Sequence, residues 1–399
     1  MPATVAPVRF EPRSGEGWRD PFPMYRRLRD EDPVHHVERG DYWVLSRFAD
    51  VFAAARDPAT FSSASGLTFS YGDMSAAGLE EVAPMVMLDP PEHTEFRRLV
   101  ARGFTPRRVA DIEPVVRAFV VERLERLQAT GGGDVVAELL KPLPSFVVAH
   151  YLGVPPADRD RFDAWTYGIV AANALGNPLL AGNAVAELLA YFSELIERRR
   201  REPGDDVISE LVAAGDGADV PPLRILGFAF TMVTGGNDTT TGLLGSGLEL
   251  LAAAPAQRRL LEERPELVPG AVEELLRVTS PVQGLARTTT RGVGIGGGRV
   301  PAGRKVLLLY AAANRDPREF GPDAEELDVT RAPRQILTFG SGAHFCLGAA
   351  AARLMGRVVL EELLARCPDY AVDATAGRFA AGHFVRRYES LPFSWGGGD

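Results

Sequence analysis

The spacing of apolar residues along the chain predicts a mainly helical protein. Pro23–Glu31 has the pattern of a short helix, and from Glu92 onward helical spacing dominates the chain. Clusters of glycine and proline separate the individual helices. Four further segments show this spacing: Val109–Gln128, Leu143–Leu152, Ala157–Ala172 and Ala184–Arg200.

The longest apolar run, Leu223–Ala254, ends at Pro255. As one helix it would be about 48 Å long, because each residue adds about 1.5 Å. It is apolar on nearly all sides, so we expect it to cross the protein interior. A transmembrane span is the competing interpretation. Polar residues at the centre of the run, and the lack of charged flanks, argue against it.

Short segments between and after the helices have the pattern of strands. Val34–Val37 and Tyr42–Leu45 flank Arg39–Asp41 and predict a β-hairpin. Phe61–Pro84 has the composition of a long loop, and long loops are often functional. The overall expectation is a mostly α protein with small β-sheets. The remaining expected elements are strands near Val282–Thr288 and Lys305–Leu309, a meander over Asn314–Leu337, a helix ending near Ala365, and short strands within Pro368–Trp395.

Composition narrows the class of protein. The 399 residues are 46% hydrophobic and contain no internal repeat or linker, so we expect one domain over residues 21–399 after a flexible segment over residues 1–20. No apolar leader precedes it, and two cysteines suit a reducing cytoplasm, so we expect a cytoplasmic protein without a membrane anchor. The formal net charge of −9 argues against nucleic acid as the main partner.

One of the two cysteines, Cys346, lies in the glycine-rich segment Phe339–Gly348 (FGSGAHFCLG), directly before a helical pattern. A thiolate at a helix N-terminus is stabilised by free backbone N–H groups and the helix dipole. Glycines let such a loop lie flat against a planar ligand. Cysteine thiolates hold haem iron in this way. A structural free thiol would explain the same residues.

The centre of the long apolar run carries the second candidate, Gly235–Thr239 (GGNDT). Each glycine destabilises a helix interior by about 1 kcal/mol relative to alanine. We therefore expect the helix to open locally here, beside an acid, Asp238, and a hydroxyl, Thr239. A kink with a capping threonine is the alternative interpretation.

Two helical pairs are further candidates. Glu274 and Arg277 share a helix face at i, i+3 and can form an ion pair. An ordinary solvent-exposed ion pair is the alternative interpretation. His93 and Arg97 share a face at i, i+4. Buried carboxylates of a ligand would need such cations as partners.

Together, and in this order, these motifs resemble the signatures of the cytochrome P450 family. The resemblance implies the P450 fold with its long buried central helix, haem b (iron protoporphyrin IX) as cofactor, and Cys346 as the iron ligand. It also implies that Arg331 joins Glu274 and Arg277 in a buried structural network. The cofactor-binding residues that it implies are His93, Arg97, Gly235, Arg287, Phe339, Gly340, Gly342, His344 and Gly348.

The resemblance further implies a monooxygenase that inserts one atom of O2 into a small apolar organic substrate, typically in bacterial secondary metabolism. Thr239 would hydrogen-bond dioxygen, and Asp238 would help relay the protons for O–O cleavage. Gly235 departs mildly from the alanine that the family motif often has. A hydrogen-peroxide-dependent peroxygenase and a non-catalytic haem-binding protein are the alternatives, and neither needs the Asp238–Thr239 pair.

The chain has no fused electron-transfer domain, so electrons would come from a separate ferredoxin and its NAD(P)H-dependent reductase. The basic residues proposed to face an acidic ferredoxin are Arg98, Arg102, Arg353 and Arg357. Fatty acids, terpenes, steroids, aromatics and polyketides would all suit a mostly apolar pocket. The residues expected to line it are Leu67, Phe69, Tyr71, Met85, Val86, Phe230, Val233, Thr234, Val282, Gln283, Leu285, Phe384 and Val385, with Arg386 as a further polar candidate.

Overall fold

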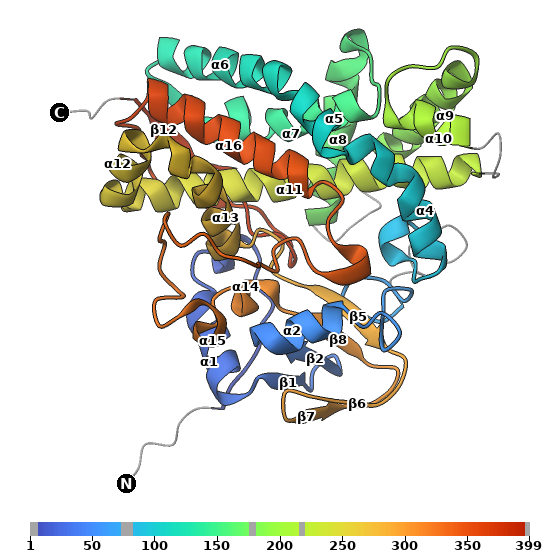
Figure 1. Cartoon of the computed structure of the whole chain (residues 1–399), viewed down its shortest axis with the longest axis vertical. Helices are drawn as coiled ribbons and strands as arrows, with labels where there is room; N and C mark the ends of the chain where they lie inside the picture. The colour runs from blue at the N-terminus through green and yellow to red at the C-terminus, as the bar shows by residue number, and fades with distance from the viewer. Residues whose placement is uncertain (1–6, 73–82, 175–180, 215–219, 396–399) are drawn as a thin grey trace.

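The computed structural model describes residues 7–72, 83–174, 181–214 and 220–395. Long helices fill one part of the molecule, and a small sheet with short helices fills the other (Figure 1). The helices are α1 (Phe22–Glu31), α2 (Phe48–Ala55), α4 (Glu92–Val100), α5 (Pro106–Asp111), α6 (Glu113–Ala129), α7 (Pro142–Tyr151), α8 (Arg159–Ala174), α9 (Gly182–Arg201), α10 (Val207–Ala214), α11 (Pro222–Ala253), α12 (Pro255–Glu263), α13 (Val268–Thr279), α14 (Tyr310–Ala313), α15 (Pro317–Phe320) and α16 (Ala349–Arg366).

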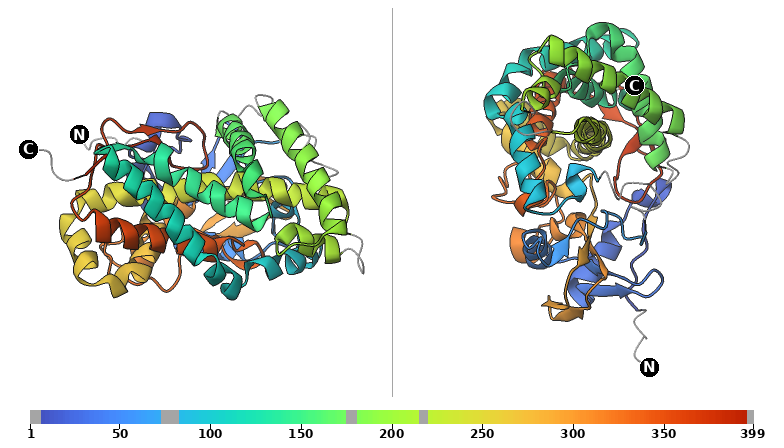
Figure 2. Two further views of the ribbon diagram at one scale, coloured as in Figure 1. Left: turned by 90° about the horizontal axis from the view of Figure 1, so that it is seen from above. Right: turned by 90° about the vertical axis from the view of Figure 1, so that its right-hand side faces the viewer.

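Helix α11 is the predicted long helix and runs through the helical part of the molecule, where Figure 2 shows it end-on among the other helices. Its stretch from Thr240 to Leu248 is buried throughout. Gly242 permits close packing there, because a Cβ at this position would lie 2.6 Å from the carbonyl oxygen of Arg386. In the described part of the chain, no helix has both the length and the apolarity for crossing a membrane.

The expected opening of this helix at Gly235–Thr239 is wrong, since α11 stays helical from Pro222 to Ala253. Side chains reinforce the backbone ladder: the Thr239 hydroxyl donates to the Gly235 carbonyl at 2.9 Å, and the Asn237 amide donates to the Val233 carbonyl at 2.7 Å. Tertiary packing around α11 therefore outweighs the low helix propensity of two glycines.

The largest sheet has the strand order β1-β2-β8-β5-β3. The predicted hairpin is confirmed: β1 and β2 are antiparallel, with Val34 opposite Leu45. β8 is parallel to β2 and antiparallel to β5, and β3 pairs with β5. Its strands are β1 (Val34–Val37), β2 (Tyr42–Leu45), β3 (Phe61–Ser62), β5 (Leu285–Thr289) and β8 (Lys305–Leu308).

The C-terminal region forms short strands, as the sequence predicts. β12 pairs with both β4 and β9, β10 pairs with β11, and β6 with β7 makes a separate ribbon. Residues 73–82 of the predicted loop Phe61–Pro84 lie outside the described residues. These strands are β4 (Gly132–Asp134), β6 (Val293–Ile295), β7 (Gly298–Val300), β9 (Ala371–Val372), β10 (Arg378–Phe379), β11 (Tyr388–Ser390) and β12 (Pro392–Ser394).

The N-terminal segment that composition predicts to be flexible contacts the C-terminal region over residues 7–20. The Trp18 side chain is 1% exposed, and its indole N–H donates to the Gly382 carbonyl at 2.9 Å. Phe10 is also buried, edge-on to Tyr42. These buried aromatic side chains hold residues 7–20 against the body of the protein, although the proline and glycine content of the segment predicts flexibility. The single domain over residues 21–399 stays a prediction.

One predicted helix is divided in the structure, and several short helices were not predicted. The expected helix Val109–Gln128 is divided into α5 and α6 at Ile112, because Pro114 stands in the first turn of α6 and has no N–H to continue the ladder. The apolar spacing also did not reveal α2, α10 and α12, which have only eight or nine residues each.

Candidate active site

Cys346 lies in a turn between a short 3-10 helix, Gly342–His344, and the first residue of α16. Its N–H donates to the Phe339 carbonyl at 2.9 Å, which closes the loop. Gly342 has a φ of 72°, and a Cβ there would lie 2.9 Å from the Ala55 carbonyl oxygen. The glycine thus lets the loop lie directly against the end of α2, and the Cys346 side chain remains exposed.

The surroundings of the Cys346 thiol act on its pKa in opposite directions. Burial by the protein behind the exposed side raises the pKa, and this is the largest influence. The Gly348 N–H and the Arg97 and Arg353 guanidinium groups oppose it. A bound metal cation would deprotonate such a thiol outright, so these donors suit a thiolate ligand.

Four of the predicted cofactor-binding side chains converge beside this loop. The rings of His93, from α4, and His344 have centroids 4.1 Å apart. Arg97 donates to the Phe345 carbonyl at 2.5 Å, and Arg287, from β5, donates to the Ala286 carbonyl at 2.8 Å. Among the described residues, neither arginine has an ion-pair partner.

The electrostatics of this cluster are those of an anion site. Burial, followed by Arg287, His93 and Arg97, lowers the pKa of His344 to about 3. Burial and then Arg97 lower the pKa of His93. The buried Nδ1 of His93 has no hydrogen-bond partner in the described part of the chain. A ligand with carboxylate groups would provide the partners that these donors lack.

Haem fits these residues. Its two propionates would meet the cluster of His93, Arg97, Arg287 and His344, and its iron would take the Cys346 thiolate. A Cβ added at Gly235 or at Gly348 would have no atom within 4 Å, so neither position crowds a flat ring. Phe339 is buried, and Gly340, with a φ of 68°, turns the same loop.

The two predicted catalytic residues lie on α11, one turn beyond the exposed Gly235. Thr239 donates its hydroxyl to the Gly235 carbonyl. Asp238 accepts from Nε of Arg387 at 2.6 Å, and their side chains are 18% and 8% exposed. Burial raises the pKa of Asp238, while Arg387 and then Lys141 lower it. Burial and the two nearby cations therefore act on the pKa of Asp238 in opposite directions.

Arg387 and Lys141 are functional candidates that the sequence analysis missed. Arg387 precedes β11, and Lys141 precedes α7, so both are far from Asp238 in the sequence. The signal that could have found Arg387 is the doublet Arg386-Arg387 within a segment whose neighbours are apolar or aromatic. No local pattern points from Lys141 to Asp238.

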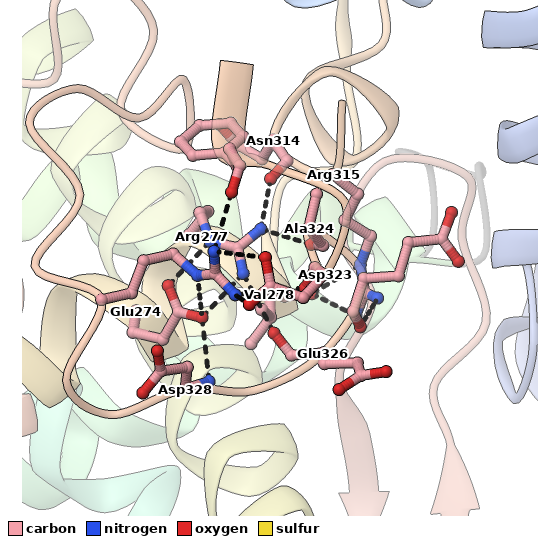
Figure 3. A network of polar contacts seen from close by, with 12 residues as sticks. Glu274, Arg277, Val278, Asn314, Arg315, Asp323, Ala324, Glu326 and Asp328 are labelled. Carbon is pink, nitrogen blue, oxygen red and sulfur yellow. Dashed lines mark hydrogen bonds and ion pairs between the residues drawn. The ribbon is translucent and has the colours of Figure 1, made fainter. Parts of the chain in front are cut away.

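The predicted structural network is confirmed (Figure 3). Glu274 and Arg277 are 0% exposed and joined by two hydrogen bonds of 2.7 Å. Arg277 also donates to the carbonyls of Asn314 and Ala324, and Arg331 donates to Glu274 at 3.1 Å. The alternative of an exposed surface pair is therefore wrong.

The residues expected to contact substrate differ in their surroundings. Met85 and Val233 belong to the buried core, and the exposed Tyr71 bonds to the Asp41 carbonyl. Gln283 and Arg386 are buried and bonded elsewhere, to Tyr25 and to Trp18 and Ser246. The others are half-buried: Leu67, Phe69, Val86, Phe230, Thr234, Val282, Leu285, Phe384 and Val385.

Comparisons with known proteins place these features in a family. Residues 180–368 match the family model described as Cytochrome P450. The chain is 63% identical to "Cytochrome P450 130" of Mycobacterium tuberculosis (strain ATCC 25618 / H37Rv), over 96% of this chain and 97% of that protein. It is 38% identical to the "Vitamin D(3) 25-hydroxylase" of Pseudonocardia autotrophica, over 90% of this chain and 89% of that protein.

A solved structure agrees with the whole fold. Cytochrome P450 CYP109Q5 from Chondromyces apiculatus is similar with a TM-score of 0.85 and 35% sequence identity. The similarity covers 95% of this chain and 96% of that one. This chain therefore belongs to the cytochrome P450 family and is a haem-thiolate monooxygenase with iron protoporphyrin IX as its cofactor.

Proposed function

We propose that this monooxygenase inserts one oxygen atom from O2 into an apolar organic substrate, with Asp238 and Thr239 handling the protons. When bound to Cys346, haem supplies the redox chemistry that activates O2. The observation that carries the proposal is the position of the half-buried Asp238, one helical turn beyond the exposed Gly235 on the central helix. That position suits an acid that supplies protons to a reaction at the exposed surface of α11.

Asp238 has the properties of a proton donor and acceptor. Its burial raises the pKa and brings it closer to the working pH, where general acid–base groups are most effective. Arg387 orients the carboxylate by an ion pair of 2.6 Å. Thr239 lies one turn from Gly235 on the same face, and its hydroxyl can turn from the Gly235 carbonyl toward a reacting oxygen.

An apolar substrate is supported by where the polar side chains point. Gln283 and Arg386 are occupied in the core, and the Thr234 hydroxyl donates to the Phe230 carbonyl at 3.0 Å. The half-buried residues of the expected pocket are otherwise mainly aliphatic or aromatic. The related vitamin D(3) 25-hydroxylase is named for a large apolar substrate, so we propose a substrate of the steroid or terpenoid kind.

We propose that a separate ferredoxin delivers the electrons. Arg98 and Arg102 are exposed, and neither has an ion-pair partner among the described residues, so both suit an acidic partner. Arg353 and Arg357 suit it less, because Glu273 pairs with Arg353, and Glu113 and Glu361 pair with Arg357. The two unpaired cysteines are compatible with a cytoplasmic location, which we also propose.

The test is a titration of the ferric haem absorption spectrum with steroids, terpenes, fatty acids, aromatics and macrolides. A saturable low-spin to high-spin shift with steroids or terpenes is the expected result. Product formation with those ligands should then require ferredoxin, reductase and NAD(P)H. A protein that reaches the same turnover with hydrogen peroxide alone, and keeps it in Thr239→Ala, would instead be a peroxygenase.

A further inference from the structure

A groove of about 600 Å³ lies between α5, α6, α13 and α16. Its apolar lining includes Val109, Val272 and Leu354. Two oppositely charged side chains also form part of its wall, Glu273 from α13 and Arg353 from α16. These two charges belong neither to the buried network of Glu274 nor to the cation cluster around His93.

Arg353 joins the groove to the Cys346 loop. Its guanidinium group pairs with both carboxylate oxygens of Glu273, with a distance of 2.9 Å between Nη2 and Oε2. The same guanidinium lies 4.7 Å from the centre of the Phe339 ring. The Phe339 carbonyl accepts the Cys346 N–H at 2.9 Å. Arg353 is therefore held between a carboxylate on one side and the thiolate loop on the other.

We propose that the Arg353–Glu273 pair sets how strongly the Cys346 thiolate donates electron density to the haem iron. Arg353 is a positioning residue, because it acts through its charge, which its contact with the Phe339 ring holds against the Cys346 loop. The inference rests on the proposed role of Cys346 as the iron ligand. A positive charge near the sulfur holds electron density there and makes ferric haem easier to reduce. Glu273 opposes this effect by partly neutralising Arg353.

The electrostatics of Cys346 agree with this arrangement. Arg353 is one of two arginines that lower the pKa of the thiol against the effect of burial; Arg97 is the other. Only Arg353, of these two, has a carboxylate partner among the described residues. The Arg353 and Glu273 side chains are 38% and 25% exposed, and ion pairs of that exposure contribute little to stability.

The same helix offers a matched control. Arg357 lies one turn further along α16, also lines the groove, and also forms ion pairs. Its partners are Glu113 on α6 and Glu361 on α16. Arg357→Gln removes one positive charge from the wall of the same groove, as Arg353→Gln does, but one turn further from Cys346 along α16.

The experiment is a spectroelectrochemical titration of the haem reduction potential in the full-length holoenzyme. We expect Arg353→Gln to shift the potential to a more negative value and Glu273→Gln to shift it to a more positive value. The double variant should lie between the two, and Arg357→Gln should match the unsubstituted protein. Both shifts should shrink in high salt, because the pair is partly exposed.

Opposite signs are the decisive outcome, since a merely structural pair would give both single variants a change of the same sign. Equal signs, or no shift in either variant, would overturn the inference. The absorption band of the ferrous CO complex tests the proposed role of Cys346 separately. If Cys346→Ser keeps the thiolate-type band, that proposed role fails. If the band is lost but the potentials do not differ, only the inference about Arg353 fails.

Discussion

Two groups of charged side chains near the Cys346 loop differ in how their charges are balanced. In the Glu274 network, Arg277 is fully buried and pairs with a carboxylate that is also fully buried. In the cluster around His93, two histidines and two arginines lie together, and neither arginine has an ion-pair partner among the described residues. The first group is electrically complete within the chain, and the second is not.

This difference separates a structural site from a ligand site. A buried ion pair whose hydrogen bonds are all made by the chain fixes segments to one another, as Arg277 does for α13 and the segments around Asn314 and Ala324. Burial, and after it the nearby Arg287, His93 and Arg97, depress the pKa of His344, so a positive charge on this ring is disfavoured. Such a cluster is unfavourable for the chain alone, so we expect it to be favourable with an anionic ligand.

The largest effect should come from breaking the balanced group. Arg277→Ala removes the main partner of the buried Glu274 carboxylate and leaves it only Arg331 and the Asp328 N–H. We expect a loss of about 3–5 kcal/mol in the free energy of unfolding. Chemical denaturation of the holoenzyme, followed by circular dichroism, measures it. Arg264→Ala is the control, because Arg264 and Glu266 form an exposed pair whose loss should change the free energy of unfolding far less. Equal losses in the two variants would contradict the comparison.

The Asp238–Arg387 pair is an intermediate case, because its charges are balanced but it lies beside the exposed Gly235. Asp238→Asn should reduce product formation about 100-fold, as expected for the loss of a general acid–base group. Stability should change far less than in Arg277→Ala. The ratio of product formed to NAD(P)H consumed measures the effect, since misdirected protons release peroxide instead.

The pH dependence of product formation sharpens this prediction. Burial raises the pKa of Asp238, and Arg387 is the main group that lowers it. Arg387→Gln removes the lowering influence, so the pKa of Asp238 should rise further. Product formation that needs the ionised carboxylate would then fall off at a higher pH on the acidic side. If the loss of product formation at low pH occurs at the same pH in Arg387→Gln, or is still present in Asp238→Asn, a group other than Asp238 causes it.

How far the sequence could predict these sites depends on whether the contact is local. Glu274 and Arg277 are three residues apart on one helix, so their pairing follows from helical geometry. Whether the pair is buried does not, because burial depends on Asn314, Ala324 and Glu326 from a distant segment. The family motifs predicted that outcome where the spacing could not.

The same reasoning explains the errors. Local propensity predicted an opening at Gly235 and Gly236, but the packing of α11 among other helices decided its course. Arg387 and Glu273 became visible as site residues only when distant segments met. Gln283 and Arg386 were polar candidates for the substrate pocket, and each is hydrogen-bonded within the core instead.

Removing one member of the unbalanced group should affect haem rather than folding. Arg287→Gln should weaken haem retention by about tenfold or more, the size of a lost charge-assisted hydrogen bond to a propionate. Transfer of haem to an apo-myoglobin acceptor measures the loss. Arg291→Gln is the control, because Arg291 is exposed near the end of the same strand. If Arg287→Gln retains haem fully, the cluster does not hold the propionates.

The smallest effect should come from charges that are unpaired and also fully hydrated. Arg98 and Arg102 are exposed, so water stabilises them without a ligand, in contrast to the buried Arg287. The double variant Arg98→Glu/Arg102→Glu should slow reduction by ferredoxin a few-fold at low salt, with an unchanged haem spectrum. Stopped-flow formation of the ferrous CO complex measures the rate. The difference should vanish at high salt, because screening removes the attraction between exposed charges. A rate that does not depend on these arginines at low salt would place the docking surface elsewhere.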